Sequence, residues 1–224
     1  MRSSLLDRAE LPSASGVFAL QNDRMLKVDL AGTDGHFYAR QGSMVAYQGE
    51  VDFAYQGSGG VAKLFKKAFT GEGMSLMRVS GTGDVFLASN ADEIHLLWLE
   101  GESVTVNGPN VLAFESGLAW DIKRVEGASM LSGGLFNTTF TGTGVLAITV
   151  HGTPVVLNVD VPTFVDVQSA VLWSTTLQSG VRRTAKAGAL IGRGSGEAYQ
   201  LTLTGQGFVV VQSSEGHVVE PHSH

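Results

Sequence analysis

The residues that could do acid–base or metal chemistry are few and scattered in this 224-residue chain. His36, His95 and His151 stand far apart in the sequence, and none has a partner at the helical spacing with which two histidines hold a metal. Three more histidines fall within residues 217–224, where no regular pattern would hold them rigidly. The chain has no cysteine, which excludes a thiol nucleophile and any cysteine-ligated zinc or iron–sulfur site.

Two further patterns approach catalytic motifs without matching them. Residues 192–196 read Gly-Arg-Gly-Ser-Gly, but the serine stands one place later than the nucleophile elbow Gly-x-Ser-x-Gly requires. Carboxylates pair at Glu50 and Asp52 and again at Asp92 and Glu93, as glycoside hydrolysis needs, yet such pairs in acidic loops are ordinarily solvated. The sequence therefore predicts that the protein is not an enzyme and has no catalytic residue, no metal site and no cofactor.

The elements that carry these residues are predicted to be β-strands. Apolar and polar residues alternate along 104–106, 157–161 and 199–204, which is the period of a half-buried strand. Gly, Asn, Asp and Ser interrupt the chain at short intervals, as they do between many short strands. With 43% hydrophobic and 16% charged residues, the chain has enough apolar material for a folded core. These features predict an all-β fold.

Segments that would direct the chain into or across a membrane are not apparent in the sequence. No stretch reaches the roughly 18 apolar residues that a transmembrane helix needs. Near the N-terminus, Asp7 interrupts the apolar run that a secretory signal peptide requires. We therefore expect a cytoplasmic protein.

A glycine motif recurs three times at nearly even spacing. Residues 80–83, 141–144 and 204–207 each read hydroxyl-Gly-x-Gly, and each motif is followed by an apolar run. Glycine adopts positive φ without steric cost, so each motif is interpreted as the tight turn of a β-hairpin. A phosphate-binding loop would need a helix after the glycines, and a strand is expected there instead.

A second repeated block lies between the glycine motifs. Residues 45–47, 112–114 and 171–173 each place an aromatic side chain two residues after a branched aliphatic one, a pattern interpreted as core packing on a strand. The chain opens with such a block and closes with a glycine motif, so the last hairpin is expected to complete the first unit. This predicts one closed domain of three pseudo-symmetric repeats over residues 17–212, with a lead-in over 1–16 and a flexible tail over 213–224.

The basic residues concentrate in three glycine-rich connectors that follow the aromatic blocks, at 57–76, 123–139 and 182–199. Together the connectors hold nine basic and three acidic residues, so they carry +6, and the remainder of this chain of net charge −6 carries −12. Equivalent connectors in a pseudo-threefold molecule emerge at the same end. One basic end on an acidic body would steer anionic partners, although the acidic total argues against general nucleic-acid binding.

The first connector contains a predicted short amphipathic helix. Val61, Leu64, Phe65 and Ala68 follow the i, i+3, i+4, i+7 spacing of one helical face, and three lysines fall largely on the other side. Such a helix can lie on a membrane surface with its phenylalanines at the acyl boundary and its lysines on anionic head groups. It can equally be a lid over the β core or a contact between subunits of a homo-oligomer.

Three sequence segments, which occur in the same order in a known family, resemble the motifs of that family. They are Ala-Arg-Gln-Gly-Ser-Met-Val-Ala-Tyr at 39–47, Phe-Thr-Gly-Glu-Gly at 69–73 and Val-Ser-Gly-Thr-Gly at 79–83. The chain resembles the bacterial branch of the altered-inheritance-of-mitochondria (twenty-four) family, which is largely uncharacterised. The resemblance implies repeated β units with a fold similar to the tryptophan RNA-binding attenuation protein. It implies no established activity, no cofactor and no catalytic residue.

Taken together, these observations predict a non-enzymatic binding or scaffold protein whose basic connector end engages an anionic partner such as a membrane surface. The predicted contact residues are Lys63, Leu64, Phe65, Lys66, Lys67, Phe69, Arg182 and Arg183. The alternative is a small-ligand or RNA-binding module that uses grooves between β units. The core-like positions of the aromatic residues and the acidic strands argue against RNA, which is read by exposed aromatics beside basic groups.

Overall fold

The computed structural model describes residues 16–55, 75–124, 136–183 and 199–214. Within these ranges the chain forms fifteen strands and two 3-10 turns of three residues each, and no α-helix, so the expected all-β fold is confirmed. The predicted helix over residues 61–69 lies outside the described residues, as do nearly all of the predicted lead-in and tail. No helix in the described ranges is long and apolar enough to cross a membrane.

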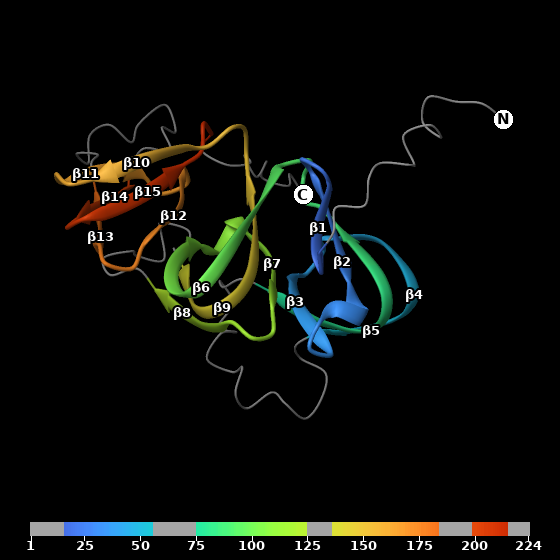
Figure 1. Ribbon diagram of the computed structural model, residues 1–224. Coiled ribbons are helices and arrows are strands. Elements are labelled where there is room, and N and C mark those ends of the chain that lie inside the picture. The colour runs from blue at the N-terminus through green and yellow to red at the C-terminus, as the bar shows by residue number, and fades with distance from the viewer. Residues whose placement is uncertain (1–15, 56–74, 125–135, 184–198, 215–224) are drawn as a thin grey trace.

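The strands fall into three consecutive groups that follow one another across the molecule (Figure 1). The first group contains β1 (Phe18–Asn22), β2 (Met25–Asp29), β3 (His36–Arg40), β4 (Met44–Tyr55) and β5 (Leu76–Leu87). The second contains β6 (Glu93–Asn107), β7 (Val111–Glu115), β8 (Ala119–Arg124) and β9 (Phe136–Val150). The third contains β10 (Val155–Val159), β11 (Thr163–Asp166), β12 (Ala170–Ser174), β13 (Gln178–Arg183), β14 (Tyr199–Thr204) and β15 (Gly207–Val211).

Antiparallel pairing joins the three groups into one extended sheet. This sheet has twelve strands. Ten follow the order β1-β2-β5-β3-β7-β9-β6-β12-β15-β10, while β4 pairs with β5 and β8 pairs with β9 beside this path. The remaining strands form a second sheet in the order β11-β14-β13. Two seams connect the groups, namely β3 against β7 and β6 against β12. We refer to these as the first seam and the second seam.

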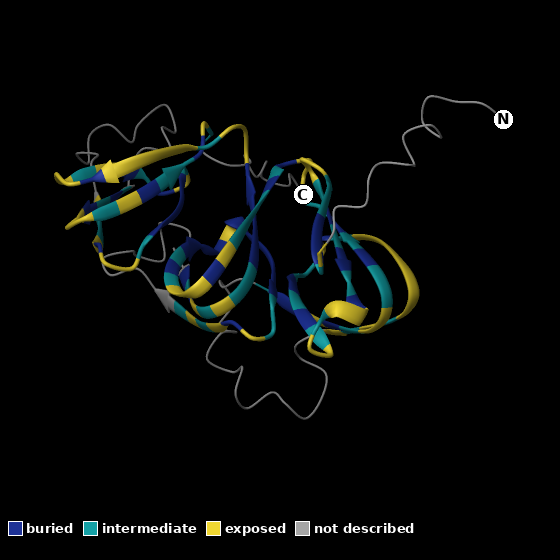
Figure 2. Cartoon of the chain, in the orientation of Figure 1, coloured by how far each residue is buried: buried dark blue, intermediate teal, exposed yellow. Residues whose placement is uncertain are grey.

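Three hydrophobic cores follow the three groups, and the first two extend across the seams to include side chains of the neighbouring group. The first core contains Leu26, Phe37 and Leu87, the second contains Phe114 and Phe140, and the third contains Trp173. Inward-facing side chains of facing strands build these cores, as the alternating sequence pattern predicts. Figure 2 shows that buried residues line the inside of each group and that exposed residues follow the outer strands.

The glycine motifs are bends within or between strands, so the expectation of three hairpin turns is wrong. β5 and β9 run through the first two motifs without reversing, and the third motif joins β14 to β15, which belong to different sheets. The predicted positive φ is nevertheless present, for example at Gly81 (φ 120°) and Gly83 (φ 119°). The glycines let a paired strand turn sharply from one layer of the core to the other without reversing direction.

The expected closure of the chain on itself is not found among the described strands. The last strands, β14 and β15, pair with β10 to β13 of their own group and not with the first group. β4 pairs with β5 alone, and β11 pairs with β14 alone. The described sheet is therefore open, and Figure 1 places β4 and β11 at opposite ends of the molecule.

Candidate functional site

The titratable side chains of the described ranges do not gather into a catalytic or metal centre. No cluster of three or more His, Asp or Glu side chains suited to a metal occurs within these residues. The nearest pair joins His151 Nδ1 to Asp92 Oδ1 at 2.9 Å and links the turn before β6 to the end of β9. Asp92 was expected to be solvated, but it is only 9% exposed. The carboxylate is thus part of the packing between two strands of the second group.

His36 lies at the start of β3, where its ring meets Tyr38 edge-on at 5.2 Å between centroids. Burial lowers the pKa of His36 below its ordinary value, and the positive charge of Arg78 lowers it further. The neutral imidazole is therefore favoured near pH 7, and this histidine serves packing beside the first seam.

Of the predicted contact residues, only Arg182 can be placed with its side chain. Its guanidinium carbon lies 3.8 Å from the centroid of the Phe164 ring, and its Nε and Nη2 atoms donate to Gln200 Oε1 at 3.2 and 3.0 Å. These three side chains belong to β13, β11 and β14, the three strands of the small sheet. Arg183 has a place in β13, but its side chain is outside the description, and Lys63 to Phe69 lie wholly outside the described residues.

An exposed apolar edge lies at one end of the molecule, along residues 44–48 of β4, which we call the β4 edge. Tyr47 is 50% exposed and Val45 is similarly exposed, and neither side chain carries a charge that would favour its contact with water. The prediction that the aromatic blocks form the core is wrong for this first block. It is confirmed for the other two, since Phe114 is fully buried and Trp173 is 3% exposed.

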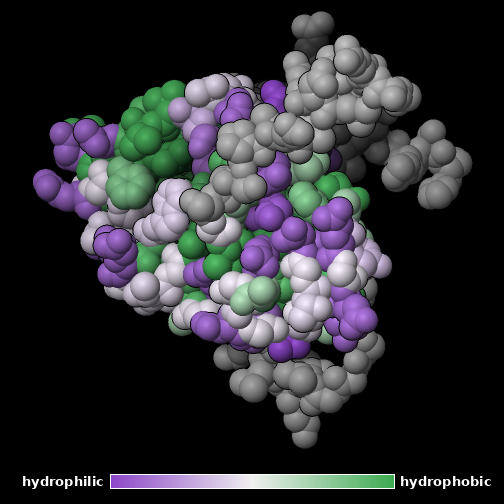
Figure 3. Space-filling model, turned by 45° about the vertical axis from the view of Figure 1, so that its right-hand side comes forward, coloured by the Kyte–Doolittle hydropathy of each residue, from purple (hydrophilic) through white to green (hydrophobic). Residues whose placement is uncertain are grey.

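A second exposed edge lies at the opposite end, along residues 163–166 of β11, which we call the β11 edge. Phe164 is 46% exposed there beneath the Arg182 guanidinium. Apolar side chains are also exposed on the adjoining β10, at Val155, Val156 and Leu157. Figure 3 shows hydrophobic residues gathered at the end of the molecule that holds β10 and β15.

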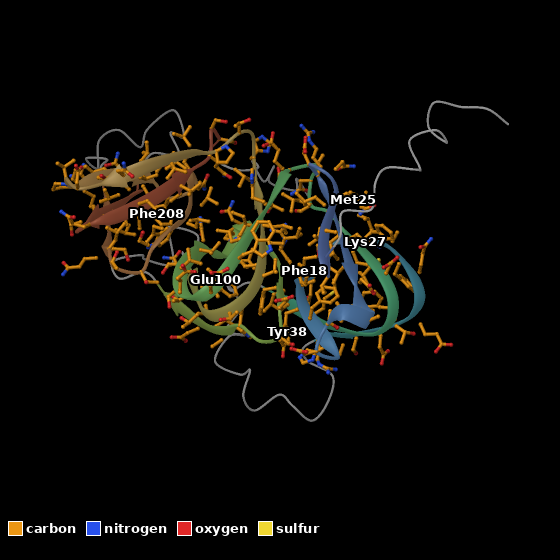
Figure 4. All side chains as sticks on the ribbon, viewed as in Figure 1. Phe18, Met25, Lys27, Tyr38, Glu100 and Phe208 are labelled. Atoms are coloured by element: carbon orange, nitrogen blue, oxygen red, sulfur yellow. The ribbon has the colours of Figure 1, made fainter. Side chains whose placement is uncertain are left out.

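At the first seam, a comparable aromatic block is covered by a neighbouring strand, and its ring packs against other aromatic rings. At the first seam, Tyr38 of β3 stacks on Phe114 of β7 with 5.3 Å between ring centroids, and Phe114 also meets Phe140 at 4.9 Å. In Figure 4, Tyr38 lies between the first and second groups of strands. Sequence reasoning missed the β4 and β11 edges, because the exposed blocks have the same residue types as the buried ones.

Comparison with known proteins identifies relatives of the whole fold. No curated protein matches the chain significantly. A crystal structure of a Streptococcus pyogenes protein, solved by a structural genomics consortium, is similar at a TM-score of 0.71 with 24% identity, covering 88% of this chain and 92% of that one. At this identity the likeness establishes the fold. The model of the mitochondrial biogenesis AIM24 family matches residues 18–214, so the expected family is confirmed. The chain belongs to the mitochondrial biogenesis AIM24 family.

Proposed function

We propose that this protein is a non-enzymatic scaffold made of three copies of one β unit. In this proposal the units stand side by side, and their basic connectors face an anionic partner, most simply a membrane surface. The units span residues 25–87, 93–150 and 155–211. The acidic remainder of the chain then points away from the anionic partner, which orients the molecule by its own electric field.

The observation that carries the proposal is the recurrence of one pairing scheme relative to the glycine motif. In each unit we compare the residue four places after the last glycine of the motif, which is Leu87, Ile148 or Val211. Leu87 pairs with Leu26, Ile148 pairs with His95, and Val211 pairs with Val155. Since the strand partners recur at the same offset, the three units are interpreted as repeats of one structure.

The same scheme supports an equivalent origin for the three basic connectors. Each connector joins the two strands of an antiparallel pair of the same kind, namely β4 with β5, β8 with β9, and β13 with β14. The last register pairs before the connectors are Tyr55 with Met77, Arg124 with Phe136, and Arg183 with Tyr199. Connectors that leave equivalent strand pairs add their charges on equivalent faces of the units.

Flotation with liposomes tests the membrane proposal. We expect the protein to float with vesicles that contain anionic phosphatidylglycerol, to float less at high salt and to stay behind with neutral vesicles. Lys66→Glu/Lys67→Glu should weaken binding about thirtyfold or more, because each lysine near an anionic surface contributes about 1 kcal/mol.

A charge-matched variant in the described body provides the control. Arg24→Glu/Arg78→Glu alters the net charge by the same amount as the lysine variant. Both arginines are exposed, Arg24 in the turn between β1 and β2 and Arg78 on β5. Equal loss of flotation in the two variants, or no flotation of the unmodified protein under any condition, would contradict the proposal.

A further inference from the structure

The two seams inside the chain share one register. At the first seam, Tyr38 is opposite Phe114 and Ala39 is opposite Ala113. At the second seam, Thr105 is opposite Trp173 and Val106 is opposite Leu172. In both cases the strand of the earlier unit pairs antiparallel with the aromatic block of the next unit. The same antiparallel pairing between neighbouring units therefore occurs twice in the chain.

The glycine motif identifies the residues that occupy the same positions on the third unit. Tyr38 pairs with Arg78, two places before the motif begins, and Thr105 pairs with Thr139, which has the same offset. Phe164 pairs with Thr202, which again stands two places before its motif. Phe164 on the β11 edge is therefore the counterpart of Tyr38 and Thr105.

The aromatic blocks identify the counterpart on the first unit. Tyr47 occupies the place of Phe114 and Trp173 in the repeated block. Residues 45–48 are exposed throughout, whereas residues 111–114 and 170–173 are buried throughout. The difference follows from the neighbour, because β7 and β12 are each covered by a strand of the preceding unit, whereas β5 is the one strand among the described residues that pairs with β4.

We propose that the β4 edge of one copy pairs antiparallel with the β11 edge of a second copy, with Tyr47 opposite Phe164. This inference rests on the repeat in the proposed function and names its partner, which is another copy of this chain. Thr163 then faces Gln48, Val165 faces Ala46, and the two half-exposed rings meet where Tyr38 and Phe114 stack at the first seam.

The character of the β4 edge supports pairing with a strand. Residues 44–48 contain no charge and no proline, the features with which proteins commonly protect a free edge. The edges differ from each other and lie at opposite ends of the molecule (Figure 1), so the contact is head to tail. In a head-to-tail contact, each added copy still has one unpaired edge to which another copy can bind. Growth therefore stops only when the first and last copies pair and close a ring.

Sedimentation velocity of the unmodified protein and of two single variants tests the pairing. The unmodified protein should sediment as a multiple of the 23.6 kDa chain. Tyr47→Glu and Phe164→Glu should each remain monomeric at concentrations at which the unmodified protein associates. A carboxylate in the covered joint should weaken association about a hundredfold or more.

Mixing the two variants tests the head-to-tail arrangement. Tyr47→Glu keeps an intact β11 edge and Phe164→Glu keeps an intact β4 edge, so an equimolar mixture should form a dimer with one copy of each and grow no further. Trp98→Glu is the matched control, because Trp98 is 66% exposed and belongs to neither edge, and it should associate like the unmodified protein. Circular dichroism confirms that each variant is folded.

Three results would overturn the inference. These are a monomeric unmodified protein at high concentration, association that persists in both single variants and so uses another surface such as β10, and a mixture that stays monomeric. The proposed function can fail separately, since a monomer that floats with anionic vesicles would refute the pairing and leave the membrane proposal standing.

Discussion

Replacing Gly83 by alanine is expected to lower the free energy of unfolding by about 3 kcal/mol or more. A Cβ at this position would lie 1.9 Å from the carbonyl oxygen of Gln48 and 3.0 Å from the Cα of Gly49, both of which are backbone atoms of the paired β4. The φ of Gly83 is also positive, at 119°. Since neither strand can yield by rotating a side chain, the β4–β5 pair must separate at the bend.

Gly35→Ala separates the steric effect from the conformational one. Gly35 also has a positive φ, at 81°, but a Cβ there would meet nothing within 4 Å. Its replacement should cost only the backbone strain, about 1–2 kcal/mol. Urea unfolding followed by tryptophan fluorescence measures both losses. Equal destabilisation by the two substitutions would contradict the role of the glycine motif as a site of close strand approach.

Phe114→Ala is expected to lower the free energy of unfolding by about 3–5 kcal/mol, because it empties a fully buried aromatic site. The ring of Phe114 meets Tyr38, Trp120 and Phe140 at centroid distances of 5.3, 5.9 and 4.9 Å. Its removal opens a cavity at the first seam, where strands of two groups pair. The second unit should therefore lose its contact with the first as well as part of its own core.

The equivalent substitution in the first unit should behave differently. Tyr47→Ala removes a half-exposed ring that meets Phe53 edge-on at 5.4 Å between centroids. In dilute solution, where chains are separate, we expect it to lower the free energy of unfolding by about 1 kcal/mol. Its effect should be found in self-association instead. A loss of stability as large as that of Phe114→Ala in dilute protein would mean that Tyr47 is covered within its own chain and would contradict the repeat account.

The strand content was predictable from the sequence because it depends on local patterns. Alternation along residues 199–204 marks β14, and the buried run at 112–114 lies in β7. The positive φ values at Gly81 and Gly83 follow from the glycine requirement of a sharp bend. The family was identifiable from the order of its motifs, which the match over residues 18–214 confirms.

The pairing partners were not predictable in the same way, because they depend on contacts between distant segments. A glycine bend in a hairpin and one in a continuous strand read alike in sequence, and only the pairing of β4 along β5 distinguishes them. The exposure of Tyr47 was missed for a related reason. Its block has the composition of a buried strand, and whether it is covered depends on a neighbour that the described strands do not supply. The helix at 61–69 stays a prediction.

Disulfide cross-linking across the proposed joint tests the central claim most directly. The chain contains no cysteine, so Tyr47→Cys/Phe164→Cys introduces the only two thiols. Residues directly opposite on antiparallel strands lie within the Cα separation of roughly 4.4–6.8 Å that a disulfide spans. The two engineered positions lie on strands at opposite ends of the molecule, so a bond between them must join two copies.

Under mild oxidation, the account predicts a ladder of covalent multimers from the double variant on a denaturing gel. Each single variant should remain a monomer, and so should Tyr47→Cys/Trp98→Cys, which places the second thiol outside the β11 edge. Failure of the double variant to cross-link, or equally efficient dimerisation of Tyr47→Cys alone, would contradict head-to-tail pairing of the β4 and β11 edges.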